Sequence, residues 1–272
     1  IHWAHRVGYT RSFRAAGATL VQIGTADTTC EWELEEAINA NTAAVAYVFA
    51  PRQSGALPFP KVVDIAHGRG VPVIVDAAAM LPPAENLTRY VAMGADMVSF
   101  SGGKGVLGPQ STGILCGRND LIEAARLNSS PNSDGIGRTA KVCKEEIAGL
   151  IAAMQLFVDT DHHAVMADWR AKCEHVVSSL QGIPGLKVEL AEATPELDEF
   201  LSATPRALIF FDKSWRGPSE EEVVEELKEG DPSIRVGSAS FAGGIAVIPV
   251  CLQVDEEQTV AQRLKDILTS RR

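Results

Sequence analysis

Two residues in the first half of the chain are of types that could do chemistry together. Asp76 ends the apolar segment VPVIVD, and Lys104 lies among glycines in SFSGGKGVLGPQ, directly after the apolar segment ADMV. Each apolar segment is typical of a buried strand, and the carboxyl ends of neighbouring parallel strands meet at the edge of the sheet where ligands bind. The pattern therefore predicts that the carboxylate and the amine share a site.

A carboxylate and an amine placed in this way suit pyridoxal phosphate. The amine of Lys104 would hold the cofactor aldehyde as a Schiff base, and Asp76 would accept a hydrogen bond from the protonated pyridine nitrogen. The glycines around Lys104 would let the backbone approach the cofactor closely. Ser99 or Ser101 could reach the cofactor phosphate or the lysine.

Less specific interpretations exist for each residue taken alone. An aspartate after a strand often forms a turn or caps a helix, and a lysine in a glycine-rich loop can simply be solvated. The segment GGKGVLG also lacks the spacing G-x-x-x-x-G-K-[ST] of a phosphate-binding loop. Together, within alternating helices and strands, Asp76 and Lys104 favour the cofactor site.

The elements that must position these residues follow an α/β pattern. Apolar runs separated by amphipathic stretches predict a mostly parallel sheet with helices on both faces. We expect strands at 18–24, 42–50, 71–77 and 95–101, and helices at 31–40, 60–70 and 86–95. The segment 111–117 follows too closely for a crossover helix, so we expect it to return antiparallel.

The second half of the chain has a different pattern. A polar loop at 128–138 precedes a long helical stretch at 144–180, with a break expected near 159–163. Beyond it we expect a small α+β domain, with strands at 186–191, 206–212, 233–237 and 244–250 and helices at 219–230 and 255–268. The predicted organisation is a large cofactor-binding domain at 1–150, a connecting helix at 151–180 and a small C-terminal domain at 181–272.

Composition narrows the functional classes. The chain has 272 residues, 46% of them hydrophobic, and a net charge of −10 with a pI near 5.1. This acidity argues against a nucleic-acid surface, and no apolar run is long enough to span a membrane. The five cysteines are scattered and show no zinc-binding spacing, so we expect no metal site and reduced thiols in a cytoplasmic protein.

Three segments carry a family resemblance: VIVDAAAMLPP, SFSGGKGVLGPQSTGILCG and GIGRTAKVCKEEIAGLIAA. In them the chain resembles fold type I pyridoxal-phosphate enzymes, in particular the group of bacterial seryl-tRNA selenium transferase and D-glucosaminate-6-phosphate ammonia-lyase-like proteins. The resemblance implies that Asp76 pairs with the ring nitrogen, that Lys104 forms the internal aldimine, and that Ala78 and Ser101 contact the cofactor. It covers most of the chain up to about residue 153.

The resemblance extends to further site residues. It implies that His5 stacks on the cofactor ring, and that the loop gripping the phosphate would precede the present first residue, so the large domain is expected to be N-terminally incomplete. Arg138 and Lys141 lie three positions apart, so at a helix start they would share one face, and the resemblance implies that they bind an anionic group of the substrate or cofactor. Arg235 falls where many such enzymes bind a substrate carboxylate.

The sequence as a whole predicts an enzyme that uses pyridoxal phosphate on an amino acid or amino-sugar acid. The resemblance favours a lyase that catalyses elimination, with the freed Lys104 amine taking the α-proton. The alternatives are an aminotransferase, a selenium-transferase-like transferase, or a truncated relative without catalytic activity. A homo-oligomer is expected by analogy, and neither a membrane nor a nucleic acid is expected as a partner.

Overall fold

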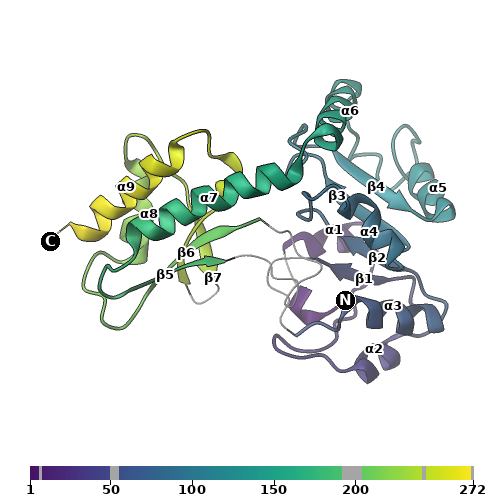
Figure 1. Ribbon diagram of the computed structural model, residues 1–272. Helices are drawn as coiled ribbons and strands as arrows, with labels where there is room; N and C mark the ends of the chain where they lie inside the picture. Colours follow the sequence, from purple (N-terminus) through teal and green to yellow (C-terminus); the bar gives the residue numbers. More distant parts are fainter. Residues whose placement is uncertain (6–7, 50–54, 192–203, 241–242, 271–272) are drawn as a thin grey trace. The chain divides into compact units, whose positions relative to one another are not determined.

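The computed structural model describes residues 1–5, 8–49, 55–191, 204–240 and 243–270. The chain divides into two compact units, the first comprising the described residues up to Thr160 and the second those from Asp161 (Figure 1). The finer division into a domain at 1–150, a connecting helix at 151–180 and a domain at 181–272 stays a prediction.

The first unit contains a four-stranded sheet in the order β1-β2-β3-β4. Strands β1 (Val45–Val48), β2 (Val73–Asp76) and β3 (Met97–Ser101) are parallel, and β4 (Gly113–Gly117) pairs antiparallel with β3. All four residues of β1 are buried, which is why this strand is apolar throughout rather than alternating. The predicted parallel sheet and its antiparallel return are confirmed.

Helices precede, connect and follow these strands along the chain. They are η1 (Trp3–His5), η2 (Gly8–Thr10), α1 (Arg11–Ala15), α2 (Glu31–Ala37), α3 (Phe59–Gly68), α4 (Asn86–Ala92), α5 (Asn119–Leu127) and α6 (Lys144–Asp159). Proline in its first turn fits the start of α3, where its missing N–H has no helical partner.

The strand expected at 18–24 is wrong. In this segment Ile23 makes only an isolated bridge to His2, and Val21 is 54% exposed. Because Ile23 is the one buried side chain of the segment, it has no continuous apolar face to pack into a sheet.

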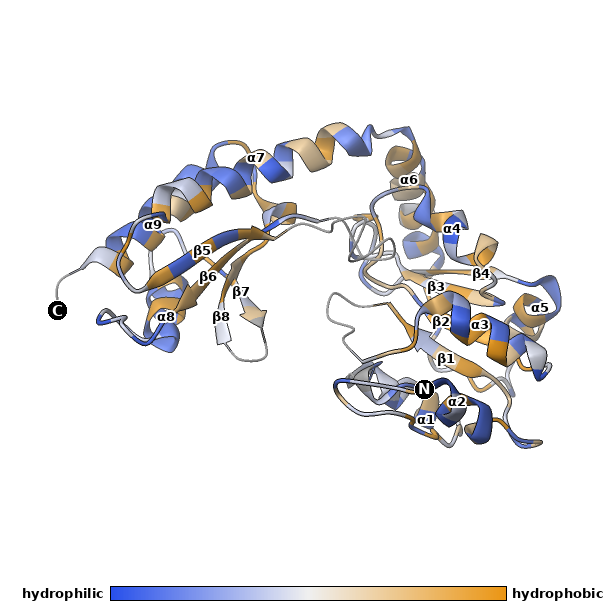
Figure 2. Ribbon diagram, turned by 60° about the horizontal axis from the view of Figure 1, so that its bottom comes forward, coloured by the Kyte–Doolittle hydropathy of each residue, from blue (hydrophilic) through white to orange (hydrophobic). Residues whose placement is uncertain are grey.

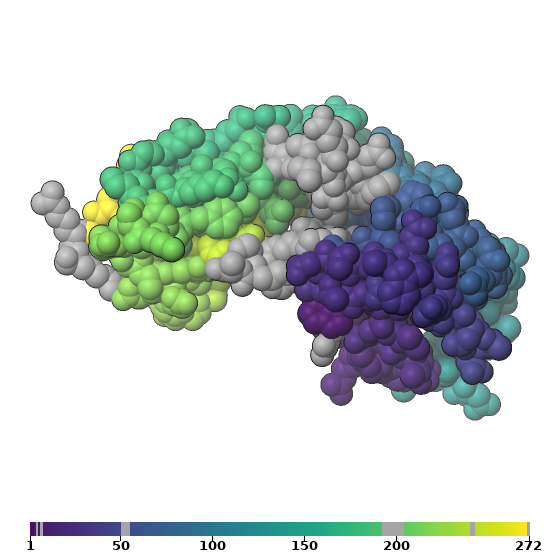
Figure 3. Space-filling model, turned by 90° about the horizontal axis from the view of Figure 1, so that it is seen from below, coloured from purple at the N-terminus to yellow at the C-terminus, as the bar shows by residue number. Residues whose placement is uncertain are grey.

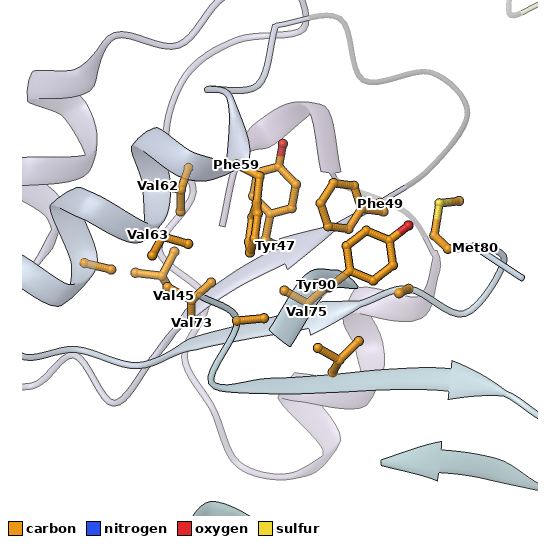
Figure 4. Close-up of a cluster of buried hydrophobic side chains, with 14 of the residues drawn as sticks. Val45, Tyr47, Phe49, Phe59, Val62, Val63, Val73, Val75, Met80 and Tyr90 are labelled. Carbon is orange, nitrogen blue, oxygen red and sulfur yellow. The ribbon is translucent and has the colours of Figure 1, made fainter. Parts of the chain in front are cut away.

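Aromatic rings dominate the core beside β1, as Figure 4 shows. Tyr47 of β1 lies 5.0 Å from Phe59 of α3, and Phe49 stacks on Tyr90 of α4 at 4.6 Å between ring centroids. Large rings bury much apolar area and prefer offset or edge-on contacts, so this cluster fixes α3 and α4 against the sheet. The Tyr47 hydroxyl donates to the carbonyl of Leu57.

The second unit is an antiparallel sheet with helices, in the strand order β5-β6-β8-β7. Its elements are α7 (His162–Leu180), β5 (Leu186–Ala191), β6 (Arg206–Phe211), α8 (Glu220–Glu229), β7 (Gly237–Ser240), β8 (Gly243–Val247), η3 (Pro249–Cys251) and α9 (Glu256–Thr269). Strand β6 is drawn mostly in the hydrophobic colour in Figure 2. The predicted α+β pattern is confirmed.

Two local expectations for the second half have different outcomes. The predicted helix break is confirmed, because Asp161 caps α7 by accepting hydrogen bonds from the backbone of His163 and Ala164. The strand expected at 233–237 is displaced to β7. The backbone N–H of Ile234 donates to the carbonyl of Leu227, which ties this segment to the end of α8 instead of to the sheet.

The described residues form neither a membrane-spanning helix nor a metal site. None of the helices formed by these residues is long and apolar enough to cross a membrane. The described residues also contain no group of three or more His, Cys, Asp or Glu side chains that could hold a metal ion.

Candidate active site

Asp76 lies at the carboxyl end of β2, between two parallel neighbours. The strand register places it opposite Val48 of β1 and Ser99 of β3. Its half-buried carboxylate accepts one hydrogen bond, from the backbone N–H of Ala78 to Oδ1 at 3.0 Å. Within the described part of the chain this is its one recorded partner, so most of its acceptor capacity is available to a ligand.

Lys104 lies in the loop that follows β3, and its side chain is exposed. The loop is closed by backbone hydrogen bonds from Gly102 to Thr112 at 2.9 Å and from Gly108 to Gly102 at 2.8 Å. The amide of Leu107 also donates to the carbonyl of Lys104 at 2.8 Å. These bonds hold the lysine on a compact turn at the carboxyl edge of the sheet.

The glycines beside Lys104 serve contacts within the protein that the sequence did not reveal. A Cβ atom on Gly105 would lie 2.0 Å from the carbonyl oxygen of Leu81, and one on Gly102 would lie 2.1 Å from Oγ1 of Thr112. Both positions therefore require glycine. The Gly105 contact joins the Lys104 loop to the segment that follows Asp76, so the structure brings the two segments together.

The smaller residues predicted for the site, Ser99, Ser101 and Ala78, are half-buried. Ser99 lies opposite Asp76, and its hydroxyl is 3.5 Å from the carbonyl of Val75. Ser101 is the last residue of β3, one position before the glycine turn. Ala78 contributes its backbone N–H to the Asp76 carboxylate, so its contact with a cofactor stays a prediction.

His5 lies at the same edge of the sheet, but it is deeply buried. Its side chain is 2% exposed, and its Nδ1 accepts a hydrogen bond from the backbone N–H of Val48 at 3.2 Å. The ring contacts Tyr47 edge-on at 4.5 Å, and Nε2 has no hydrogen-bond partner. The ring does not present an open face here, so its stacking on a cofactor stays a prediction.

Burial also explains the charge state of the two N-terminal histidines. Burial lowers the pKa of His5 to about 3, helped by the proximity of His2, and lowers the pKa of His2 to about 4. His2 accepts a hydrogen bond from the backbone of Leu57 at 3.2 Å. Both rings are therefore neutral at neutral pH and bind the first residues of the chain to the segments around β1.

Tyr9 is a residue near Lys104 that sequence reasoning missed. The Nζ atom of Lys104 lies over the Tyr9 ring, 5.7 Å from the ring centroid, and Tyr9 is 70% exposed. The only sequence signal was its place in a cluster of aromatic and histidine residues at the start of the chain.

The expectation that Arg138 and Lys141 share a helix face is wrong. Arg138 lies in a turn where its backbone N–H donates to the carbonyl of Gly135, and Lys141 lies in irregular chain before α6. Helix α6 begins only at Lys144 because Cys143 and Glu146 form its capping box. Whether these cations bind an anion stays a prediction.

Arg235 belongs to the second unit. Its exposed side chain lines a pocket of about 260 Å³, together with Ile234, Val247 and Val260. Its role toward a substrate carboxylate stays a prediction.

The residues present fit pyridoxal phosphate by their donor and acceptor chemistry. A carboxylate with unfilled acceptor positions suits a protonated ring nitrogen, and an exposed primary amine on the adjacent loop suits an aldehyde. Both groups stand on backbone whose geometry is fixed, Asp76 by the strand register and Lys104 by the glycine turn.

Comparisons with known proteins agree with this chemistry. The Aminotransferase class-V family matches residues 2–204. The chain is 33% identical over 257 residues to a 5'-C-glycyluridine monooxygenase-decarboxylase from Streptomyces sp., covering 93% of this chain and 61% of that protein. It is 30% identical over 270 residues to D-glucosaminate-6-phosphate ammonia lyase from Salmonella typhimurium, covering 97% of this chain and 68% of that protein.

Further similarity comes from selenium transferases and from solved structures. An L-seryl-tRNA(Sec) selenium transferase from Rhizobium meliloti is 30% identical over 212 residues, covering 67% of this chain and 44% of that protein. A solved structure of D-glucosaminate-6-phosphate ammonia-lyase superimposes with a TM-score of 0.72 at 28% identity, covering 98% of this chain and 69% of that one.

The resemblance and the fold class predicted from the sequence are both confirmed by these matches. The chain spans about three fifths of the length of the Streptomyces relative. The family match covers well over half of the chain. The protein therefore belongs to the Aminotransferase class-V family of fold type I pyridoxal-phosphate enzymes.

Proposed function

We propose that this chain is part of a pyridoxal-phosphate-dependent lyase that acts on an amino acid or amino-sugar acid. The observation that carries the proposal is the contact of the Lys104 loop with the segment after Asp76, at the carboxyl edge of a parallel sheet. The amine at this edge suits the cofactor aldehyde, and the carboxylate with free acceptor positions suits the protonated ring nitrogen.

Pyridoxal phosphate, when bound, supplies an electron sink for the charge left on the substrate Cα after a bond to that carbon breaks. The protein residues do the rest. The Asp76 carboxylate would hold the proton on the ring nitrogen, because an anion beside a cation favours the charged form. The Lys104 Nζ would hold the cofactor through its aldehyde, and as a free amine it would accept the proton from the substrate Cα.

Similarity to known proteins favours a lyase over a transferase. The relatives that span nearly the whole of this chain are named as an ammonia lyase and a monooxygenase-decarboxylase, whereas the selenium transferase aligns over 67% of it. The bond that breaks in the substrate differs between these activities, but each fits the same Lys104 and Asp76. Transamination, selenium transfer and a non-catalytic role are the alternatives.

Three cations could bind an anionic group of the substrate. Arg138 and Arg235 carry the planar fork of donors that suits a carboxylate or phosphate, and Lys141 offers a point charge. Arg138 and Lys141 lie in the first unit, three positions apart, and Arg235 lines the pocket of the second.

The test is covalent labelling of Lys104. The full-length protein is incubated with pyridoxal phosphate, reduced with borohydride and digested, and the modified lysine is identified by mass spectrometry. We expect the adduct on Lys104, and its loss in Lys104→Ala. Lys144→Ala is the matched control, because it removes another exposed lysine of the first unit and should leave the adduct in place. An adduct spread evenly over surface lysines would contradict the proposal.

The assembly and location of the protein are further parts of the proposal. Ile147 and Ile151 lie one turn apart on α6 and are 49% and 66% exposed, an apolar stripe that suits contact with a second copy. The five cysteines are all free thiols, which fits the reducing cytoplasm. Light scattering of the full-length protein would test the homo-oligomer, and a monomer at micromolar concentration would refute it.

A further inference from the structure

We propose that Tyr9 is the platform that receives the amino group of the incoming substrate. This inference rests on the proposed function, because it assigns a new residue to the Lys104 site. The Nζ of Lys104 lies over the face of the Tyr9 ring, 5.7 Å from its centroid. That distance is within the range at which an aromatic face attracts a cation.

Tyr9 lies in a segment that has buried residues before and after it. On one side, His5 is buried and bonded to the backbone of Val48, which pairs with Asp76 across the sheet. On the other side, Thr10 is 4% exposed and its hydroxyl accepts a hydrogen bond from Arg14 at 3.4 Å. Tyr9 is thus an exposed ring in a segment that its buried residues attach to the first unit (Figure 3 shows the purple N-terminal residues on the surface of the first unit).

The exposure of Tyr9 points to a binding role rather than a packing role. A side chain that is 70% exposed contributes little to the core, yet its ring faces the reacting amine. The described structure gives its hydroxyl no hydrogen-bond partner, so the feature that acts on Lys104 is the ring face. A phenylalanine would present the same face, and an aliphatic residue would not.

The chemistry of amine exchange explains what the platform does. To displace Lys104, the substrate nitrogen must reach the place that Nζ occupies, and a substrate amine arrives as an ammonium ion at neutral pH. The incoming nitrogen then forms a bond to the aldehyde carbon, and the bond from that carbon to Nζ breaks. Before this bond forms, the incoming ammonium loses one proton to solvent, so Lys104 departs as the neutral amine that can accept the proton from the substrate Cα.

The experiment compares a cationic and a neutral nucleophile on the protein loaded with pyridoxal phosphate. Methylammonium carries the charge that the platform should attract, whereas methoxyamine is neutral at the same pH. Displacement of Lys104 is followed by stopped-flow absorbance, so no natural substrate is needed. Tyr9→Leu removes the ring and Tyr9→Phe keeps it, while Trp3→Leu is the control for removing another exposed aromatic of the same segment.

We expect Tyr9→Leu to slow displacement by methylammonium about two- to fivefold, as the strength of an exposed cation–π contact implies. Displacement by methoxyamine should be unchanged, and Tyr9→Phe and Trp3→Leu should match the unsubstituted protein for both nucleophiles. If Tyr9 had only a structural role, Tyr9→Leu would not change the ratio of the methylammonium rate to the methoxyamine rate.

Two results would overturn the inference in distinguishable ways. Equal slowing of both nucleophiles by Tyr9→Leu, or slowing of neither, would remove Tyr9 from amine binding while leaving the proposed function in place. Failure of the unsubstituted protein to attach the cofactor at Lys104 would overturn the proposed function, and this inference with it.

Discussion

The two ends of the parallel sheet each carry an aspartate, and their surroundings differ. Asp96, at the amino end of β3, is 6% exposed and accepts hydrogen bonds from the backbone of Val73 at 2.7 Å, from His67 at 2.8 Å and from Arg118 at 3.0 Å. Asp76, at the carboxyl end of β2, is half-buried and accepts a single bond, from Ala78.

This difference separates a structural carboxylate from one available to a ligand. Burial alone would raise the pKa of Asp96, but the hydrogen bonds from Val73, His67 and Arg118 outweigh it and hold the pKa below its usual range. The charge of Asp96 is thus fully used within the protein. Asp76 keeps free acceptor positions, on a segment that contacts the Lys104 loop, and this is a feature of a binding site.

Acid should weaken the carboxyl end of the sheet first, and this is the largest effect we expect. An unfolded histidine titrates near 6.5, whereas the pKa values of His2 and His5 are lowered to about 4 and 3. The unfolded state therefore binds more protons below pH 6.5, and the free energy of unfolding falls as pH drops. At pH 5 the loss is about 2 kcal/mol per histidine, on the order of 4 kcal/mol together.

Urea unfolding between pH 8 and 5 measures this loss. His5→Asn and His2→Gln keep an acceptor for the N–H groups of Val48 and Leu57 but cannot titrate, so each should flatten the pH dependence. The exposed His163→Gln is the control and should not. Asp96 cannot cause the loss, because a lowered pKa keeps its contribution intact until pH falls below about 4. An equally steep decline in the double variant would refute the assignment.

Removing the carboxylate of Asp96 should give the next largest decrease in the free energy of unfolding. Asp96→Ala leaves the buried N–H of Val73 without its acceptor and separates His67 from Arg118, which should lower the free energy of unfolding by about 2–3 kcal/mol. Urea unfolding at pH 8 measures it. Asp120→Ala removes the exposed partner of the same arginine and should leave stability unchanged. Equal losses in the two variants would contradict the assignment of the loss to the buried hydrogen bonds of Asp96.

The sequence predicted this sheet well because its strands are apolar on both faces and separated by helices with clear start signals. It also placed Asp76 and Lys104 at one edge, since parallel strands bring their carboxyl ends together. It failed where structure depends on contacts distant in the sequence. The segment around Ile23 is apolar but makes only an isolated bridge. The packing of Gly105 on Leu81 joins residues far apart in the sequence, so the sequence alone does not show it.

Charged residues were predicted by type but not by placement. Arg138 and Lys141 have helical spacing, yet Cys143 and Glu146 cap α6 and begin the helix after them. The start predicted for this helix, at 144, is confirmed, so the three-residue spacing of these two cations does not place them on one helix face. Tyr9 was missed because its contact with Lys104 joins residues 95 positions apart in the sequence.

Substitution of Asp76 should change the free energy of unfolding least. It also tests most directly whether Asp76 and Asp96 differ in role. Asp76→Asn keeps an oxygen for the N–H of Ala78, so the free energy of unfolding should barely change. It removes the negative charge that holds the ring-nitrogen proton, and a hydrogen bond between charged groups lost in this way should weaken pyridoxal phosphate binding about tenfold to a hundredfold. Fluorescence titration with the cofactor measures the affinity, and the exposed Asp64→Asn is the control. Unchanged affinity with lowered stability would make Asp76 a structural residue like Asp96, and the two ends of the sheet would then be alike.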